Sequence, residues 1–143
     1  MSRRRRRRVT VAAAGLAAVT IVAWADAAAS PRNLVATAAV KAQLREAHLR
    51  LVPLAARRTV QGPLKGLTYY GSYGSTRYAV ATFSHAGVGT TDQPELFRKP
   101  SGKPWRDRGD TGGCISSTII PSALLRLWGF RRDSLNRDCF ERG

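Results

Sequence analysis

The residue types that most often act in catalysis are scarce in this chain, which has two histidines, His48 and His85, among its 143 residues. A Ser–His–Asp site built on His85 with Asp92 or Asp110 lacks the G-x-S-x-G turn that presents a nucleophilic serine. Metal centres cluster His, Cys and carboxylate ligands, so two histidines far apart in the sequence are a weak basis for one.

Paired carboxylates can hydrolyse a glycosidic bond, and Asp92, Glu95 and Asp107 are the candidates for such a pair. The chain holds only nine Asp and Glu residues in total, and no local motif singles these three out. The sequence therefore predicts a protein that is not an enzyme, with no catalytic residue, no metal site and no cofactor.

The two cysteines, Cys114 and Cys139, both lie after residues 1–29, which resemble a signal peptide. Paired, they would close a loop of about 26 residues and stabilise the fold by roughly 3–4 kcal/mol in the chain-entropy account. The alternative is two separate thiols, which an oxidising compartment disfavours. We predict a Cys114–Cys139 disulfide bond.

Residues 1–29 have the three parts of a signal peptide: the basic run Arg3–Arg8, the apolar run Val9–Ala25, and small residues that offer Ala-x-Ala cleavage patterns. The apolar run is short and mostly alanine, which is weak for a stable membrane span. A retained signal anchor is the alternative, and a basic cytoplasmic tail is a third. The leader predicts a secreted protein.

Residues 30–66 are expected to form one long helix followed by a connecting loop. Ser30 and Pro31 are typical of a helix start, and Pro53 stops the pattern. The helix carries one apolar stripe at Val40, Leu44, Ala47 and Leu51.

A second stripe of the same helix repeats the spacing with Lys41, Arg45 and His48. The commoner interpretation of such a stripe is a solvated face, with His48 an exposed histidine. The sharper interpretation is a small anion-binding surface made by these three residues.

Residues 67–129 are rich in Tyr, Val, Thr and Phe, with turn residues at short intervals, which predicts an antiparallel sheet. Gly74-Ser75 and the segment Pro100–Lys103 are the expected turns of two hairpins, giving four strands. In the second strand we place Ala79, Ala81 and Phe83 against the helix, because small side chains admit it closely. Tyr78, on the opposite face, is expected to be half exposed.

A short helix is expected to begin at Pro121 and to end at Gly129. Residues 130–143 mix four arginines with three acidic side chains and are interpreted as a polar, basic tail.

Several short blocks of this chain, in the same order, resemble a family of small exported proteins or lipoproteins of high-GC Gram-positive bacteria, for which no function is known to us. The blocks are Tyr69-Tyr70-Gly71, Tyr78–Phe83, Thr91–Pro94, Phe97-Arg98, Trp105, Gly109–Gly113 and Trp128-Gly129. The resemblance implies export and a compact domain of helix and sheet, and it brings no catalytic residues. Residues after Gly129 are extra to the pattern.

Taken together, the sequence predicts an α+β domain with one N-terminal amphipathic helix packed on a four-stranded antiparallel sheet, and a short C-terminal helix. The formal charge is +15, with 24 Lys and Arg against nine Asp and Glu. The expected function is a non-catalytic binding module outside the cell, attracted to anionic cell-envelope polymers or an acidic protein. The alternative is an inhibitor of a secreted enzyme. No nucleic-acid-binding module is recognised.

Overall fold

The computed structural model describes residues 29–86 and 94–142. The predicted signal peptide, apart from Ala29, lies outside the described residues, as does Asp92. Within the described residues, no helix has the length and apolar character needed to span a membrane.

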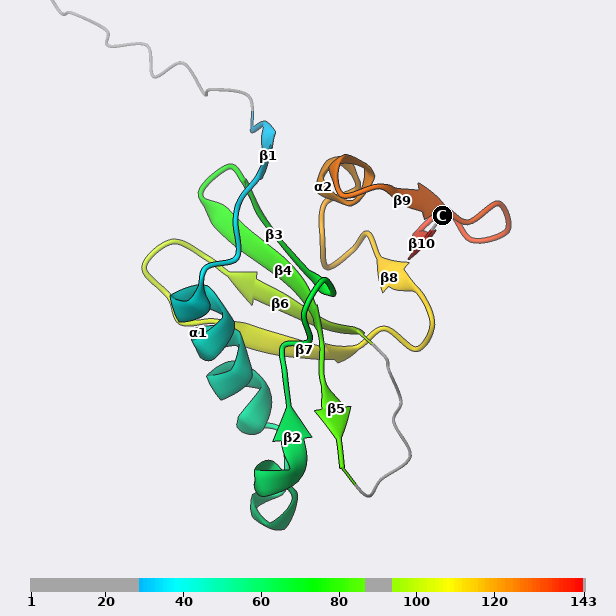
Figure 1. Ribbon diagram of the computed structural model, residues 1–143. Helices are drawn as coiled ribbons and strands as arrows, with labels where there is room; N and C mark the ends of the chain where they lie inside the picture. Colours follow the sequence, from blue (N-terminus) through cyan, green and yellow to red (C-terminus); the bar gives the residue numbers. More distant parts are fainter. Residues whose placement is uncertain (1–28, 87–93, 143) are drawn as a thin grey trace, which may run out of the picture.

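The described chain is an α+β domain built on a five-stranded antiparallel sheet (Figure 1). The strand order is β1–β3–β4–β6–β7. The bounds are Pro31–Asn33, Thr68–Tyr73, Thr76–Thr82, Pro94–Lys99 and Arg106–Asp110. The two predicted hairpins are present, with turns between β3 and β4 and between β6 and β7. The prediction of four strands is one short, because β1 pairs with β3 and forms a fifth strand at the edge of the sheet.

The N-terminal helix is shorter than predicted. Pro31 and Asn33 pair with Tyr73 and Gly71, so Ser30-Pro31 leads into an edge strand, where proline is tolerated, and not into a helix. Helix α1 spans Ala38–Leu49. Its N-cap is Thr37, which accepts a hydrogen bond from the backbone nitrogen of Val40 at 3.3 Å.

Helix α1 covers one face of the sheet, and the predicted face is confirmed. Leu44 and Ala47 share a buried cluster with Ala79, Ala81 and Phe83. Leu51 does not join this cluster: it is 62% exposed because α1 ends before it.

The predicted connecting loop between α1 and the sheet holds two short elements. These are the 3-10 helix η1 (Leu54–Thr59) and strand β2 (Val60–Gln61). Strand β2 pairs with β5 (Ser84–His85), which follows β4. This pairing places His85 opposite Val60. Figure 1 shows β2 and β5 side by side, beyond the C-terminal end of α1.

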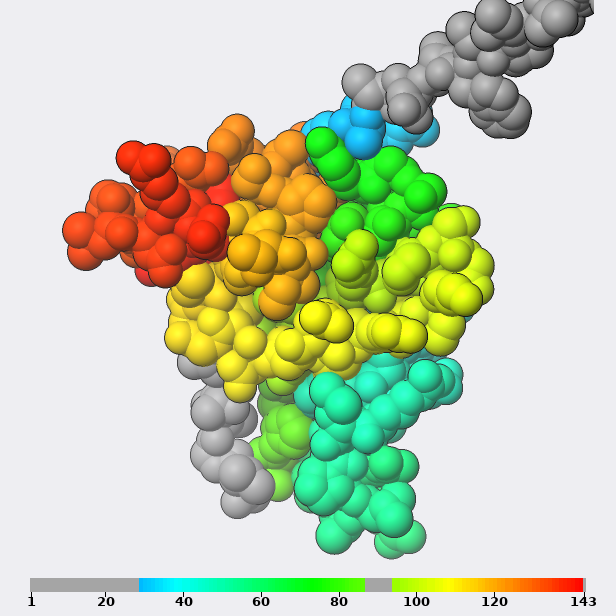
Figure 2. Space-filling model, turned by 180° about the vertical axis from the view of Figure 1, so that it is seen from behind, coloured from blue at the N-terminus to red at the C-terminus, as the bar shows by residue number. Residues whose placement is uncertain are grey.

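The opposite face of the sheet is also covered, by the C-terminal part of the chain. Helix α2 (Ser122–Leu127) packs there with a three-stranded sheet in the order β8–β10–β9. Tyr78, Val80 and Leu96 belong to this second core, and Tyr78 is only 7% exposed. The expectation that Tyr78 is half exposed is therefore wrong. Figure 2 shows the C-terminal segment, orange to red, and the segment of α1 and η1, cyan to green, at opposite ends of the molecule.

Residues 130–142 are not a free tail. Strands β8 (Ile115–Ser116), β9 (Phe130–Arg132) and β10 (Cys139–Arg142) form the small sheet. Two phenyl rings of this segment, Phe130 and Phe140, are buried in the second core. The predicted disulfide bond is present and joins Cys139 to Cys114, with 5.4 Å between the Cα atoms.

Candidate functional site

The three residues of the predicted anion-binding surface do not share an exposed face. His48 is 5% exposed, and the Nη2 group of Arg45 donates a hydrogen bond to the backbone oxygen of Val60 at 3.1 Å. Lys41 is partly buried. The interpretation of His48 as an exposed histidine is wrong, because His48 follows Ala47 and lies one turn after Leu44, within the stripe of α1 that packs on the sheet.

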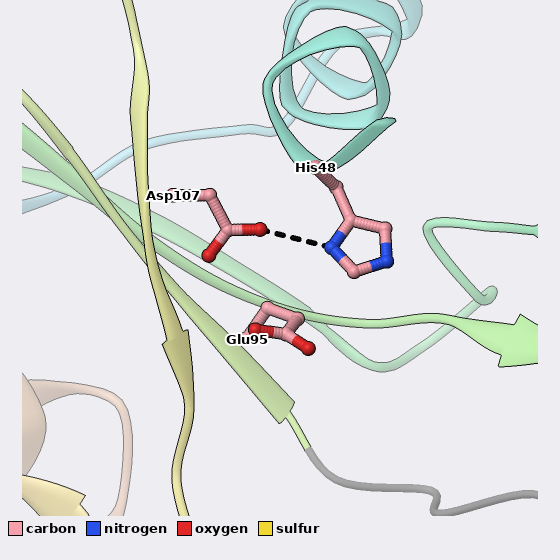
Figure 3. A group of neighbouring side chains, drawn as sticks. All are labelled: His48, Glu95 and Asp107. Atoms are coloured by element: carbon pink, nitrogen blue, oxygen red, sulfur yellow. Dashed lines mark hydrogen bonds and ion pairs between the residues drawn. The ribbon is translucent and has the colours of Figure 1, made fainter. Parts of the chain in front are cut away.

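His48 is held by three side chains. Its Nδ1 atom lies 2.9 Å from Oδ2 of Asp107, a contact marked by the dashed line in Figure 3. Its ring stacks on Phe83, with centroids 4.3 Å apart and an angle of 14° between the planes. Its Nε2 atom lies 3.4 Å from Nε2 of His85. These contacts fix both the position and the plane of the imidazole.

Glu95 lies beside this pair, on the neighbouring strand (Figure 3). Strand β7 has an extra residue relative to β6, because Phe97 pairs with Asp107 while Glu95 pairs with Asp110. Gly109, with φ of +92°, lies within this irregularity. The bulge therefore brings two aspartates of β7 next to one glutamate of β6.

Burial, and next the negative charge of Asp107, raise the pKa of Glu95 from its ordinary 4.5 to about 7. Asp110 and a hydrogen bond with Asp107 act in the same direction, and His48 acts against them. Below about pH 7 the neutral form of Glu95 is therefore favoured in the folded protein.

This shift predicts a pH-dependent stability. Between pH 4.5 and about 7 the folded chain keeps a proton on Glu95 that the unfolded chain has released, so the free energy of unfolding falls as the pH rises through this window. We expect the free energy of unfolding of the wild type to decrease by about 1–2 kcal/mol across this window, after allowance for solvent screening. Glu95→Gln should remove this decrease.

Denaturant melts from pH 4 to 8, in the presence of a chelator, measure this effect. Glu46→Gln is the matched control, because Glu46 is exposed and its ion pair in the described chain is with Arg50. Parallel stability curves for wild type and Glu95→Gln would contradict the prediction.

Two groups of side chains in the described part of the chain have the composition of a metal site. One is His48, Glu95 and Asp107, whose ligand atoms lie within 4.8 Å of one another. The other is Asp133, Cys139 and Glu141. The sulfur of Cys139 is bonded to Cys114 and offers no thiolate.

A separate basic surface lies on strands β6 and β7. Arg98 pairs directly with Arg106 across the two strands, and Arg108 follows on the same edge strand. All three side chains are exposed, and their guanidinium groups make no hydrogen bond or ion pair to any described residue. We call Arg98, Arg106 and Arg108 the arginine face. It presents three charges free to bind an anion.

A cavity of about 570 Å³ lies between the large sheet and the small C-terminal sheet. Its lining is largely apolar and includes Leu67, Val80, Ile115, Phe130 and Phe140. Its size and character suit a small molecule. Its arginine, Arg142, already donates a hydrogen bond to the hydroxyl of Tyr69 at 2.7 Å, so this charge is less available than those of the arginine face.

Comparison with known proteins gave no matching family model, no matching curated protein and no matching solved structure. The resemblance to small exported proteins therefore stays a prediction.

From the sequence alone, Glu95 and Asp107 are candidates only for glycoside hydrolysis, and no motif connects them to His48. Part of this arrangement could have been predicted from the alternation of residues along the hairpin strands. A hairpin turned at Pro100–Lys103 places alternate residues of both strands on one face, and both carboxylates fall on the face assigned to the helix. The position of His48 could have been predicted too, because His48 lies one turn after Leu44 and next to Ala47, on the helix stripe predicted to face the sheet.

Proposed function

We propose that the protein acts outside the cell as a non-catalytic binding module that holds an anionic cell-envelope polymer on its arginine face. The observation that carries this proposal is the direct cross-strand pairing of Arg98 with Arg106, neither of which forms an ion pair with a carboxylate of the described chain.

Two like charges directly opposite each other destabilise an antiparallel pair. An anion that binds between the two guanidinium groups relieves this repulsion and stabilises the pair. Guanidinium groups suit phosphate and carboxylate oxygens because they donate two parallel hydrogen bonds to them. The arginine face therefore favours a ligand with anionic groups spaced along a chain, one for each arginine.

The charge balance of the whole domain supports a polymer over a single small anion. The described residues hold eighteen Lys and Arg against seven Asp and Glu. Of these seven, Glu46 is paired with Arg50, and Asp107 is turned inward to His48. A long polyanion gains from this excess charge beyond the three arginines it touches.

The proposed location rests on two features. The first is the basic and apolar leader of the sequence, and the second is the Cys114–Cys139 disulfide bond, which suits an oxidising compartment.

Salt dependence tests the proposal against its alternative. The probe is a phosphodiester polymer such as poly(glycerol phosphate), with a neutral polysaccharide as control, and binding is measured by titration at increasing ionic strength. We expect affinity for the polyanion to fall steeply towards physiological salt, where the screening length is about 8 Å. The neutral control should not bind.

An inhibitor of a secreted enzyme would behave differently, because a packed protein interface depends much less on salt. Absence of polyanion binding even at low salt would contradict the proposed function.

A further inference from the structure

We propose that His48, Glu95 and Asp107 form a binding site for one divalent first-row transition-metal ion. The three side chains come from α1, β6 and β7 and converge beneath the end of the helix (Figure 3). One ligand atom from each lies within 4.8 Å of the others. This site is independent of the arginine face and of the proposed polymer binding.

Charge and burial favour a cation here. The side chain of Asp107 is 1% exposed and that of His48 is 6% exposed. No lysine or arginine of the described chain forms an ion pair with Glu95 or Asp107. Buried carboxylates are normally paired with a positive charge or bound to a metal. Here the only such partner of Asp107 in the described chain is His48, and a divalent ion would replace the proton that these two side chains share.

The distances suit a small ion. Ligands bound at about 2.0–2.2 Å from a common metal lie roughly 3–4 Å from one another. The Nδ1 atom of His48 and Oδ2 of Asp107 are 2.9 Å apart and share a proton, which is released when both atoms bind the metal. Glu95 is at most 4.8 Å from each, so a modest side-chain rotation completes the set.

The donor set selects the class of metal. One imidazole nitrogen and two carboxylate oxygens suit Zn²⁺, Mn²⁺, Fe²⁺ or Co²⁺. Ca²⁺ and Mg²⁺ prefer oxygen ligands alone and more of them. We therefore expect Zn²⁺ or Co²⁺ to bind in preference to Mg²⁺ or Ca²⁺.

The surroundings of His48 also fit a ligand role. Stacking on Phe83 holds the ring in plane. With Nδ1 on the metal, the hydrogen of the ring is on Nε2, and His85 Nε2 lies 3.4 Å away as its acceptor. A hydrogen bond from the second ring nitrogen is the usual support of a metal-bound histidine.

The experiment uses untagged protein, since His48 and His85 are the only histidines of the chain. The protein is stripped with a chelator and titrated calorimetrically with Zn²⁺, and with Co²⁺ while visible absorption is recorded. We expect one ion per chain and a Co²⁺ spectrum with nitrogen and oxygen ligands. Excess Mg²⁺ should not displace the ion.

Glu95→Gln and Asp107→Asn keep the shape of each side chain and are expected to weaken Zn²⁺ binding by about 10- to 100-fold. Glu141→Gln is the matched control, because Glu141 belongs to the cluster whose cysteine is in the disulfide. Its affinity should equal that of the wild type. Thermal melts of the metal-free variants confirm that each one folds.

Failure to bind one ion per chain would overturn the proposal. So would equal weakening by Glu141→Gln and Glu95→Gln, or displacement of Zn²⁺ by Mg²⁺. None of these results bears on polymer binding, so the two proposals fail separately.

Discussion

Replacing Phe83 with alanine is expected to lower the free energy of unfolding by about 3–5 kcal/mol, which is the usual loss for a buried phenyl ring. Phe83 is 2% exposed, stacks on His48 and lies 6.1 Å from Phe97, measured between ring centroids. Its ring therefore joins α1 to the sheet. A loss of this size is a large share of the roughly 5–15 kcal/mol that stabilises a small domain.

Urea denaturation followed by far-UV circular dichroism measures this effect. Leu135→Ala is the control, because Leu135 is 96% exposed and its removal should change stability by less than about 0.5 kcal/mol. Similar midpoints for Phe83→Ala and Leu135→Ala would show that α1 does not pack on this face of the sheet.

Replacing both cysteines with serine is expected to lower the free energy of unfolding by about 3 kcal/mol, as the loss of a cross-link over this length of chain predicts. The bond joins residues 25 positions apart and holds β10 near the start of β8. Without it, the small sheet depends on Phe130 and Phe140 and on a few strand hydrogen bonds.

Denaturation of the double variant against wild type, with and without reductant, checks this prediction. Reductant should lower the stability of the wild type to that of the variant and leave the variant unchanged. Equal stability of the two proteins in the absence of reductant would contradict it.

The central hairpins could be predicted from the sequence because their information is local. Gly74 and the segment Pro100–Lys103 fix the turns, and the alternation of Ala79, Ala81 and Phe83 with Tyr78 and Val80 fixes the two faces. The face assigned to α1 is confirmed for this reason.

Edge strand β1 and the second core could not be predicted in the same way. Pro31 suits both a helix start and an edge strand, and only the distant partner Tyr73 decides between them. Phe130 and Phe140 lie in a stretch whose composition is polar, so their burial depends on a second core that forms only when the chain returns to the sheet.

The candidate site was predictable only in its parts. The carboxylates Glu95 and Asp107 share a face through hairpin alternation, and a bulge in β7 adds Asp110 to them. His48 joins them because α1 begins at Ala38 and is turned so that the Leu44 side packs inward. The arginine face depends likewise on the register of β6 against β7, which places Arg98 opposite Arg106.

The most direct test of the binding function compares two double variants of equal charge. Arg98→Gln with Arg106→Gln removes the paired arginines, and Arg58→Gln with Arg137→Gln removes two other exposed ones. Affinity for poly(glycerol phosphate) is measured for both at several salt concentrations. The arginine-face variant is expected to lose at least about tenfold in affinity and to show a shallower salt dependence, while the control stays near wild type. Equal weakening of the two variants would show that net charge alone, and not the arginine face, binds the polymer.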